Sequence, residues 1–432
     1  MMSVGSVNIC RVLLPLIVTT WMLGSAHAAS LSYIIADRMV DPVRGTVIED
    51  AALIVEDGRI SVSGRRNEVK SPDGALLIDL TGKTILPGLI DMHTHVTMDP
   101  DRRGLSGLLY SSERPIIGAV RHLERTLKSG FTTIRNLGDR SFGSVALRDA
   151  INEGDITGPR MFDSGPPIGI LGGYCSDNNT LPHQYGDVRE IGVANGPWAM
   201  REKVRNHIKY GVDLIKTCST AGIASQGIPQ NTPEELAAIV DEAHMRGFKV
   251  AVHAHGVTGI KNAIRAGVDT IEHATFIDDE SIRMARDRGI YLTINMYSGE
   301  YILADHERKP DSVSPEYLAE ERDSISQRER NFTRAVKAGA KIVFGTDAGN
   351  FPHGDNARQF ETMVRLGMTP MQSIQSATSL AAEALGKGGL YGCISTSCAA
   401  DIIAVDGDPT RDVSLLRDVR FVMKEGRVYR SD

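Results

Sequence analysis

The sequence predicts an α/β protein in which a (β/α)8 TIM barrel is joined to a small β-sandwich domain formed by both chain ends. Apolar segments of strand length alternate with helical segments over residues 85–385, as repeated parallel β/α units require. Residues 29–84 and 386–432 instead contain short alternating or apolar runs, punctuated by steps such as Asp-Gly and Thr-Gly. That texture is typical of small sheets, so the two ends are expected to form one composite domain.

Eight short apolar segments are the expected strands of the barrel. They are 84–91, 132–137, 160–164, 213–217, 249–253, 270–273, 291–295 and 341–345. Eight strands with intervening helices over about 300 residues fit a (β/α)8 barrel. An open doubly wound sheet has the same alternation and is the alternative.

Two helices are expected from their end signals. Over 232–245, Thr232 is placed to cap the helix, Pro233 occupies the first helical position and Glu235 completes a capping box. A second helix is expected over 371–385, where apolar residues again recur at helical spacing.

Residues 1–28 are expected to be an export signal that is not part of the fold. Arg11 is the only charged residue there, an apolar run covers 12–23, and Ala26-His27-Ala28 fits a small-x-small cleavage site. The run is shorter than the roughly 20 residues that cross a bilayer. We therefore expect a periplasmic or secreted protein without a membrane span in its mature form. A buried N-terminal helix is the alternative.

The charge balance excludes some classes of partner. The chain has 54 acidic and 48 basic side chains, a formal net charge of −6, and it contains no basic run or aromatic-studded basic stretch. Neither nucleic acid nor an anionic membrane surface is therefore an expected partner. The expected partner is a small-molecule substrate.

Four cysteines follow the export signal. Cys393 and Cys398 share one short segment, and Cys175 and Cys218 both follow predicted barrel strands. An oxidising compartment would permit either pair to form a disulfide. The sequence leaves disulfides and free buried thiols equally open.

Metal-ligating side chains stand at the ends of five predicted strands. They are His93 and His95 on the first, Lys216 on the fourth, His253 and His255 on the fifth, His273 on the sixth and Asp347 on the eighth. The carboxyl ends of barrel strands meet on one face, where active sites lie. Each residue alone has a structural explanation, as a packed histidine, a snorkelling lysine or a turn aspartate. Together they indicate a site for a divalent ion that prefers nitrogen and oxygen ligands.

The motifs around these residues resemble those of the metal-dependent amidohydrolase superfamily. They read PGLIDMHTH, IKTCSTAG, VAVHAHG, DTIEHA and FGTDAG, and the chain is most similar to the imidazolonepropionase-related branch of dipeptidases and carboxypeptidases. The resemblance implies two divalent ions, with zinc expected, bridged by a carbamylated Lys216. His93, His95 and Asp347 would hold one ion, and His253 and His273 the other.

The same resemblance implies a reaction. It is hydrolysis of the amide bond to a C-terminal amino acid by a hydroxide that bridges the two ions. Dipeptides or N-acyl amino acids are the expected substrates, including N-aroyl amino acids such as ochratoxin A. Asp347 would be the catalytic proton acceptor and would pass the proton to the leaving amine. Because relatives often form large homo-oligomers, a homo-oligomer is expected.

Loops after the predicted strands supply candidate substrate-binding residues. They are Tyr174, His255, Tyr297, Tyr301 and His353, with Arg308 a further candidate partner for a carboxylate. Tyr174 stands where relatives commonly carry histidine. A phenol donates the same hydrogen bond but is not protonated near neutral pH, so this departure suits an aromatic acyl group. Cys398 also departs from the family pattern, where glycine is usual, but it lies in the expected sandwich.

Two other functions match parts of this pattern. A mononuclear deaminase or cyclic-amidine hydrolase has the same fold, but usually lacks the strand-four lysine and often carries glutamate where this chain has Gly256. A non-catalytic scaffold would have no need of a full ligand set. A metal count of about two, one or none per chain distinguishes the three functions.

Overall fold

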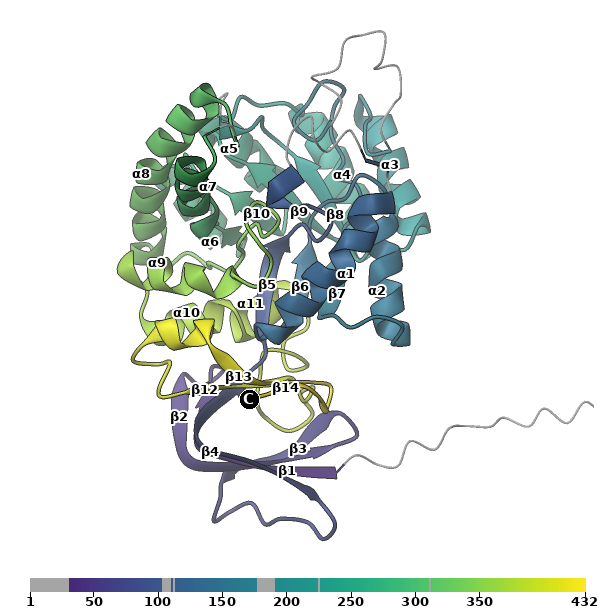
Figure 1. Ribbon diagram of the computed structural model, residues 1–432. Coiled ribbons are helices and arrows are strands. Elements are labelled where there is room, and N and C mark those ends of the chain that lie inside the picture. Colours follow the sequence, from purple (N-terminus) through teal and green to yellow (C-terminus); the bar gives the residue numbers. More distant parts are fainter. Residues whose placement is uncertain (1–30, 103–109, 112, 177–190, 224–225, 311) are drawn as a thin grey trace, which may run out of the picture.

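The computed structural model describes residues 31–102, 110–111, 113–176, 191–223, 226–310 and 312–432. Helices surround two parallel sheets, and a mixed sheet lies beneath them (Figure 1). The expected export signal, residues 1–28, lies outside the described residues. Within them, no helix combines the length and apolar character needed to span a membrane.

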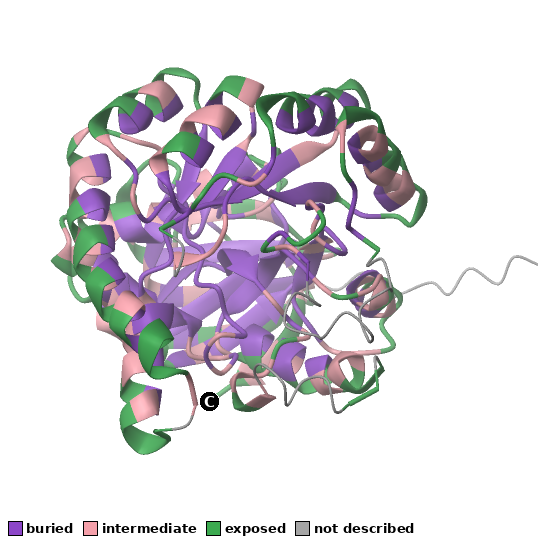
Figure 2. Ribbon diagram, turned by 90° about the horizontal axis from the view of Figure 1, so that it is seen from above, coloured by how far each residue is buried: buried purple, intermediate pink, exposed green. Residues whose placement is uncertain are grey.

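Seven strands form the two parallel sheets, in the orders β5-β6-β7 and β11-β10-β9-β8. They are β5 (Leu89–Thr94), β6 (Phe131–Asn136), β7 (Arg160–Asp163), β8 (Leu214–Cys218), β9 (Lys249–Ala254), β10 (Thr270–His273) and β11 (Tyr291–Thr293). Nearly every strand residue is buried, because helices cover these sheets (Figure 2).

The expected eighth strand, 341–345, makes single bridges instead of a ladder. Ile342 pairs in parallel with Leu292 of β11, and the nearby Ala348 pairs with Thr94 of β5. The N–H of Phe344 donates to the carbonyl of Ser376 and not to a neighbouring strand, although its carbonyl accepts from the N–H of Met92 of β5. At the other edge of the sheets, a third parallel bridge joins Ile168 to Thr217 of β8.

The expected strand 84–91 is divided in the structure. Its first part ends β4 (Leu76–Pro87), and its second part begins β5. The two strands are separated at Gly88, whose N–H donates to the carbonyl of Asp401. A Cβ atom at this position would collide with the side chain of Thr132, so the close approach requires glycine.

The helices follow the strands along the chain. They are α1 (Glu113–Lys128), α2 (Gly143–Glu153), α3 (Pro197–Lys209), α4 (Pro233–Met245), α5 (Val257–Ala266), α6 (Asp279–Asp287), α7 (Tyr297–Arg308), α8 (Pro315–Lys337), α9 (Gln359–Arg365), α10 (Pro370–Ser376) and α11 (Ser379–Ala384). The predicted capping box of α4 is confirmed. The helix expected over 371–385 is instead split into α10 and α11, because the carbonyls of Ser376 and Ala377 accept hydrogen bonds from Phe344 and Ile90.

Strands from both chain ends share one seven-stranded mixed sheet, ordered β14-β13-β12-β4-β1-β2-β3. The remaining bounds are β1 (Leu31–Asp41), β2 (Thr46–Glu56), β3 (Arg59–Arg65), β12 (Ile402–Asp406), β13 (Val419–Lys424) and β14 (Arg427–Ser431). The expected composite domain is thus built on one continuous sheet, since β4 pairs with both β1 and β12. Ile34 and Leu53 share a buried core with Phe421.

The structure pairs the four cysteines left open by the sequence. Cys393 forms a disulfide with Cys398 beside the core of the mixed sheet. Cys175 forms a disulfide with Cys218, which ties the loop after β7 to the end of β8. That link lies two residues from Lys216.

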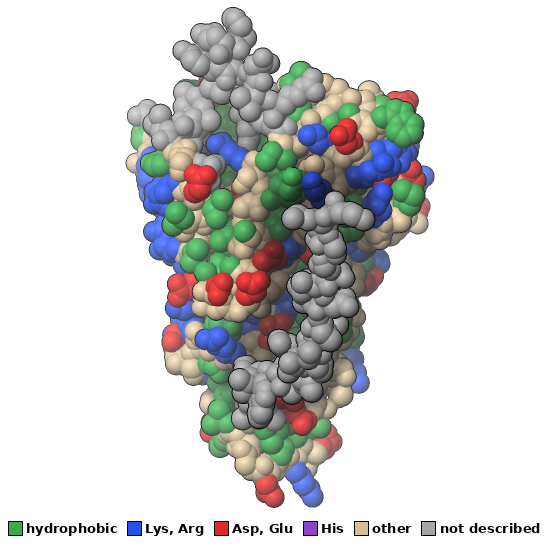
Figure 3. Space-filling model, turned by 90° about the vertical axis from the view of Figure 1, so that its right-hand side faces the viewer, with side chains coloured by type: hydrophobic (Ala, Val, Ile, Leu, Met, Phe, Trp, Pro, Cys, Tyr) green, Lys and Arg blue, Asp and Glu red, His purple; other side chains and the backbone are tan. Residues whose placement is uncertain are grey.

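Acidic and basic side chains are interspersed on the molecular face drawn in Figure 3.

Glu242 of α4 is a buried acidic residue with a structural role, and its side chain is only 1% exposed. Its carboxylate accepts hydrogen bonds from Arg205 of α3, at 2.7 and 3.1 Å, and from Arg246, at 2.9 Å. The hydrogen bond from Arg205, opposed by burial and aided by Arg246, lowers the pKa of Glu242 to about 2.

We predict an acid-dependent loss of stability through Glu242. Because its folded pKa lies below the ordinary value of 4.5, its contribution is present above that pH and is lost as the pH falls toward about 2. Glu242→Gln should lower the free energy of unfolding by roughly 1–2 kcal/mol at pH 7. In urea titrations, the difference from wild type should shrink progressively below that ordinary pKa. Glu307→Gln, at an exposed position of α7, is the control, and an equal effect there would contradict the prediction.

Candidate metal centre

The carboxyl ends of the parallel strands bring the predicted ligands together. His93, Lys216, His253, His273 and Asp347 are each no more than 8% exposed. His95 is half-buried. A cluster of buried titratable side chains at this edge is unusual unless its members are paired or bind an ion.

Asp347 is at the centre of the first group of potential ligands. One ligand atom from each of His93, His273 and Asp347 lies within 4.8 Å of the other two. The Oδ1 atom of Asp347 is 3.3 Å from Nε2 of His95 and 3.6 Å from Nε2 of His93. The two histidines, His93 near the end of β5 and His95 directly after it, therefore both face this carboxylate.

A second group overlaps the first. His253, His255 and His273 also offer ligand atoms within 4.8 Å of one another. The ring centroid of His273 is 4.5 Å from that of His253 and 4.7 Å from that of His255. His273 thus belongs to both groups. The structure places His255 among the potential ligands, whereas the resemblance left it out of the ligand set and suggested a role in substrate binding.

The chemistry of these side chains fits a bound divalent ion. In the described part of the chain, the Nε2 atoms of His93 and His253 are buried and have no hydrogen-bond partner. Burial, followed by the charge of Lys216, lowers the pKa of His93 to about 4, and burial also lowers the pKa of His253 well below its ordinary value. Both imidazoles are therefore neutral near pH 7, with lone pairs available to a metal.

Lys216 is buried in the same region. It forms no ion pair with any residue that the structure describes, although Glu272 and Asp347 are near enough to affect it. Burial lowers the pKa of Lys216 to about 8, against the opposing influence of those two carboxylates. An amine in this environment is close to its neutral, nucleophilic form.

The backbone is strained at two of these strand ends. His273 and Asp347 have φ values of 71° and 64°, in the left-handed region that side chains other than glycine rarely occupy. Such strain is often retained where function requires a particular side-chain direction. Two residues before Asp347, Gly345 leaves room for β11 and β5, since a Cβ atom there would collide with the side chain of Thr293 and lie 3.0 Å from Cβ of His93.

A buried ion pair that sequence reasoning missed supports His93. Glu272 accepts from Nδ1 of His93 at 3.0 Å and from Arg135 at 2.7 Å. Burial would raise the pKa of Glu272, but the charge of Arg135 and the hydrogen bond from His93 lower it to about 2. This bond places the proton of His93 on Nδ1 and leaves Nε2 free. The sequence did contain a signal for this ion pair, since Arg135 and Glu272 are charged residues inside otherwise apolar strands.

Asp91 was also missed. This fully buried carboxylate accepts from Thr346 Oγ1 at 2.6 Å, from Asn356 Nδ2 at 2.7 Å and from the N–H of His93 at 3.1 Å. Burial raises the pKa of Asp91 to about 6, despite these hydrogen bonds. It connects the strand that carries His93 to the segment that carries Asp347.

Of the predicted substrate-binding residues, Tyr174 lies against the potential ligands. Its ring stacks on that of His253, with centroids 4.3 Å apart and an angle of 20° between the planes. The side chain is also 54% exposed. It is therefore available to a molecule that approaches this edge of the strands.

The other candidates contact different surroundings. Tyr297 and Tyr301 pack around Phe351, with centroids at 4.8 and 6.2 Å. His353 is buried against α1, where its ring stacks on that of His122, and its Nε2 donates to the carbonyl of His95 at 3.2 Å. Arg308 pairs with Asp305 at 3.3 Å. His353 is thus placed to support the backbone of His95.

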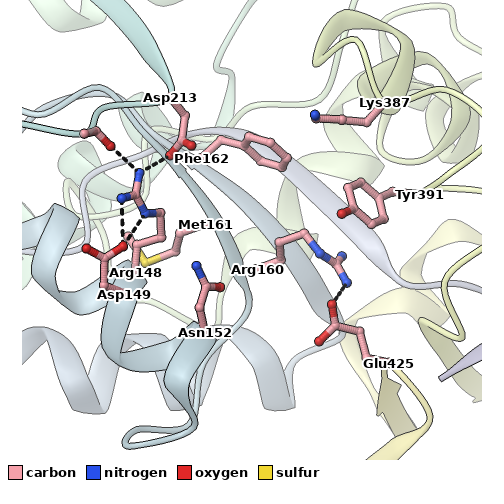
Figure 4. A pocket seen from close by; sticks show the side chains of 11 residues that line it. Arg148, Asp149, Asn152, Arg160, Met161, Phe162, Asp213, Lys387, Tyr391 and Glu425 are labelled. Carbon is pink, nitrogen blue, oxygen red and sulfur yellow. Dashed lines mark hydrogen bonds and ion pairs between the residues drawn. The ribbon is translucent and has the colours of Figure 1, made fainter. Parts of the chain in front are cut away.

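A separate hollow of about 410 Å³ lies at the amino ends of β7 and β8, away from the histidines (Figure 4). Both arginines in it are already paired. Arg148 contacts Asp149 and Asp213, each at 2.7 Å, and Arg160 contacts Glu425 at 2.6 Å. The Arg148 pairs tie α2 to the start of β8, and the Arg160 pair ties β7 to the turn between β13 and β14. The hollow is therefore a structural junction, and the histidine cluster is the candidate site.

Buried imidazoles and a carboxylate at the carboxyl edge of parallel strands define an α/β enzyme with a potential metal site. The chain belongs to the amidohydrolase family, whose model matches residues 84–429. This finding confirms the resemblance drawn from the motifs. Together with the relatives below, it makes the protein a hydrolytic enzyme that acts on amides.

Three relatives illustrate the similarity. Ochratoxinase from Aspergillus niger is 28% identical over 95% of this chain and 88% of its own, and its crystal structure gives a TM-score of 0.83. A crystal structure of a Xaa-Pro dipeptidase with bound methionine is 36% identical, with a TM-score of 0.87, and covers 93% of this chain and 100% of that one. Imidazolonepropionase from Geobacillus sp. (strain WCH70) is 22% identical over 88% of this chain and 92% of its own. These neighbours imply a TIM barrel with an additional sheet domain.

Proposed function

We propose that this protein is a binuclear-metal amidohydrolase that cleaves the amide bond to a C-terminal amino acid. The observation that carries the proposal is the pair of overlapping ligand groups that share His273. Two adjacent ions, one of them bound by the single free nitrogen of His273, account for both groups. They also account for the Nε2 atoms of His93 and His253, which have no hydrogen-bond partner among the described residues. Zinc is the proposed metal because it accepts imidazole and carboxylate ligands.

Lys216 is proposed to join the ligand set after reaction with carbon dioxide. Its neutral amine would attack the carbon atom of carbon dioxide, so that an N–C bond forms while one C=O π bond gives its electron pair to oxygen. Loss of a proton from the nitrogen to solvent then leaves an anionic carbamate. This reaction replaces a buried amine, which forms no ion pair in the described part of the chain, by an anion whose oxygens suit divalent cations. The burial of Lys216 at 3% exposure supports this assignment.

The proposed reaction assigns proton transfer to Asp347. Bound divalent ions would lower the pKa of a water molecule and polarise the substrate carbonyl. As the water oxygen bonds to the carbonyl carbon, Asp347 accepts its proton. When the C–N bond breaks, Asp347 returns the proton to the amine nitrogen. The products are a carboxylic acid and a free amino acid.

Dipeptides and N-acyl amino acids are the proposed substrates. Relatives named ochratoxinase and Xaa-Pro dipeptidase support this class. The exposed ring of Tyr174, stacked on His253, offers a flat surface and a phenol donor to an acyl group. An N-aroyl amino acid such as ochratoxin A is therefore included among the proposed substrates.

A mononuclear deaminase is the second candidate function. It fits the fold, but it leaves one of the two ligand groups and the buried Lys216 without a purpose. Gly256, three residues after His253, also lacks the carboxylate that such enzymes often carry there. These residues favour amide hydrolysis at two ions.

We expect zinc- and bicarbonate-loaded protein to release free amino acids from a panel of dipeptides and N-acyl amino acids. Liquid chromatography of the products identifies which bond is cleaved, and metal analysis gives the number of ions per chain. Chelator-treated protein is the control and should be inactive. Ammonia release from cyclic amidines, with about one ion per chain and no amide cleavage, would replace the proposal with the deaminase function.

The fold, location and assembly are proposed in more detail. We infer that the parallel strands close into one (β/α)8 barrel over 85–385, supported by the three bridges at the sheet edges. Residues 29–84 and 386–432 would form the attached sheet domain. Two disulfides support export to an oxidising compartment. A homo-oligomer remains a prediction from the resemblance.

A further inference from the structure

Asn295, which follows β11, bridges two of the potential metal ligands. Its side chain is buried, with the residue 3% exposed. Its Oδ1 atom is 2.9 Å from Nδ1 of His273, and its Nδ2 atom donates to Oδ2 of Asp347 at 2.9 Å. The bridge therefore joins a residue at the end of β10 to a residue in the segment after the expected eighth strand.

The chemistry of the three groups fixes every proton in this bridge. An ionised carboxylate only accepts hydrogen bonds, so the NH2 of the amide must face Asp347. The amide oxygen then faces His273, and Nδ1 of that ring must carry the proton. The lone pair of His273 consequently lies on Nε2. Asp347 thus orients the amide, and the amide determines the tautomer of the histidine.

The same bridge distinguishes the two oxygens of Asp347. Oδ2 is occupied by the hydrogen bond from Asn295. Oδ1 remains directed toward the Nε2 atoms of His95 and His93, at 3.3 and 3.6 Å. The oxygen that faces the candidate ligands is therefore the one free to hold an ion or receive a proton.

Asn295 is itself held from the other side. Its carbonyl accepts from Nη1 of Arg328 at 3.3 Å, and Arg328 pairs with Glu321 at 2.8 Å on α8. Arg328 and Glu321 are buried. Both residues that Asn295 joins have strained backbones, with positive φ values. A rigid amide between them would preserve two conformations that the local sequence does not favour.

We infer that Asn295 is a positioning residue that couples the metal ligand His273 to the proton acceptor Asp347. This inference rests on the proposed function, because it assigns those roles to the two bridged residues. Asparagine suits the position because one short side chain supplies both an acceptor and a donor. Alanine removes both bonds, whereas aspartate keeps the acceptor for His273 and loses the donor for Asp347.

The two variants should therefore separate binding from turnover. In Asn295→Ala, we expect metal affinity to fall about 10- to 100-fold, the usual effect of losing a residue that orients a metal ligand. The visible spectrum of the cobalt-substituted protein should also change. In Asn295→Asp, we expect affinity within about threefold of wild type but kcat lower by at least about tenfold, with KM little changed.

Asn331 on α8 provides a matched control. It is 8% exposed, and both atoms of its amide are bonded, to the carbonyl of Thr275 and to Arg334, each at 2.8 Å. Asn331→Ala removes a buried, fully bonded amide that contacts no proposed ligand. Its cobalt spectrum and metal affinity should match those of wild type.

The experiment titrates metal-free wild type and variants with cobalt, in competition with a chelator, and confirms folding by thermal melting. If Asn295→Ala does not fold, the inference is tested with Asn295→Asp alone, which should lose kcat and retain its metal affinity. Wild type that binds two ions, together with an Asn295→Ala variant of unchanged affinity and spectrum, would overturn this inference alone. An Asn295→Asp variant with wild-type kcat would also overturn it. Wild type that binds no metal would overturn the proposed function as well.

Discussion

Replacing Asp347 with asparagine is expected to lower kcat by about 10²- to 10⁴-fold, the range associated with loss of a general base or acid. The amide cannot accept a proton from water near neutral pH. It can still offer an oxygen near His93 and His95, where Oδ1 of Asp347 lies at 3.6 and 3.3 Å. Steady-state kinetics on a cleaved N-acyl amino acid should therefore show a loss mainly in kcat, and metal analysis should show most of the metal retained.

Asp355→Asn is the control for this change. Asp355 follows Asp347 on the same segment, but its side chain is 41% exposed and, among the described residues, forms an ion pair only with Arg358, at 3.5 Å. Its replacement should leave kcat within about twofold of wild type, as expected for a surface site away from the reacting atoms. Activity of Asp347→Asn near the wild-type level would remove Asp347 from the role of proton acceptor.

Replacing Lys216 with alanine should remove both the carbamate and the binding of two ions together. We expect the number of ions per chain to fall below two and activity to fall by at least about 10²-fold, because the ions supply the charge stabilisation for the reaction. Metal analysis and turnover can be measured on the same preparation. The mass of the intact wild-type chain should also show one added carbon dioxide.

Chemical rescue distinguishes a ligand from a packing residue at Lys216. A short carboxylate such as propionate can enter the space left by Lys216→Ala and replace the anionic oxygens, so it should restore part of the activity. Lys424→Met is the control, because Lys424 is a buried lysine of β13 that donates to the carbonyl of Gly158 at 3.0 Å. The Lys424→Met variant should still bind two ions per chain. Full activity of Lys216→Ala without added carboxylate would exclude a carbamylated lysine.

The residues of the site were predictable to the extent that the alternation of a strand determines which way each side chain points. His93 and His95, two positions apart, were expected on one face, and both lie near Asp347. The capping box at Thr232 was equally local and is present. By contrast, Glu272 and Asn295 were missed, because their partners come from other strands. Their roles depend on which strands are neighbours and on the register between them.

The differences between the predicted and the observed fold also arise from contacts between distant segments of the chain. The break between α10 and α11 arises because carbonyls in that segment accept hydrogen bonds from residues 90 and 344. No sequence pattern within 371–385 indicates that these carbonyls accept hydrogen bonds from other segments. The continuity of the mixed sheet follows from the pairing of β4 with strands from both chain ends.

The sequence by itself determined the family and the chemical types at the strand ends, because motifs and side-chain alternation are local properties of the chain. Only the tertiary structure decided which imidazoles share a ligand group, which nitrogen of His273 carries the proton and which oxygen of Asp347 stays free. Those outcomes depend on hydrogen bonds between residues far apart in the chain. Such bonds form only when the folded strands bring their partners within reach.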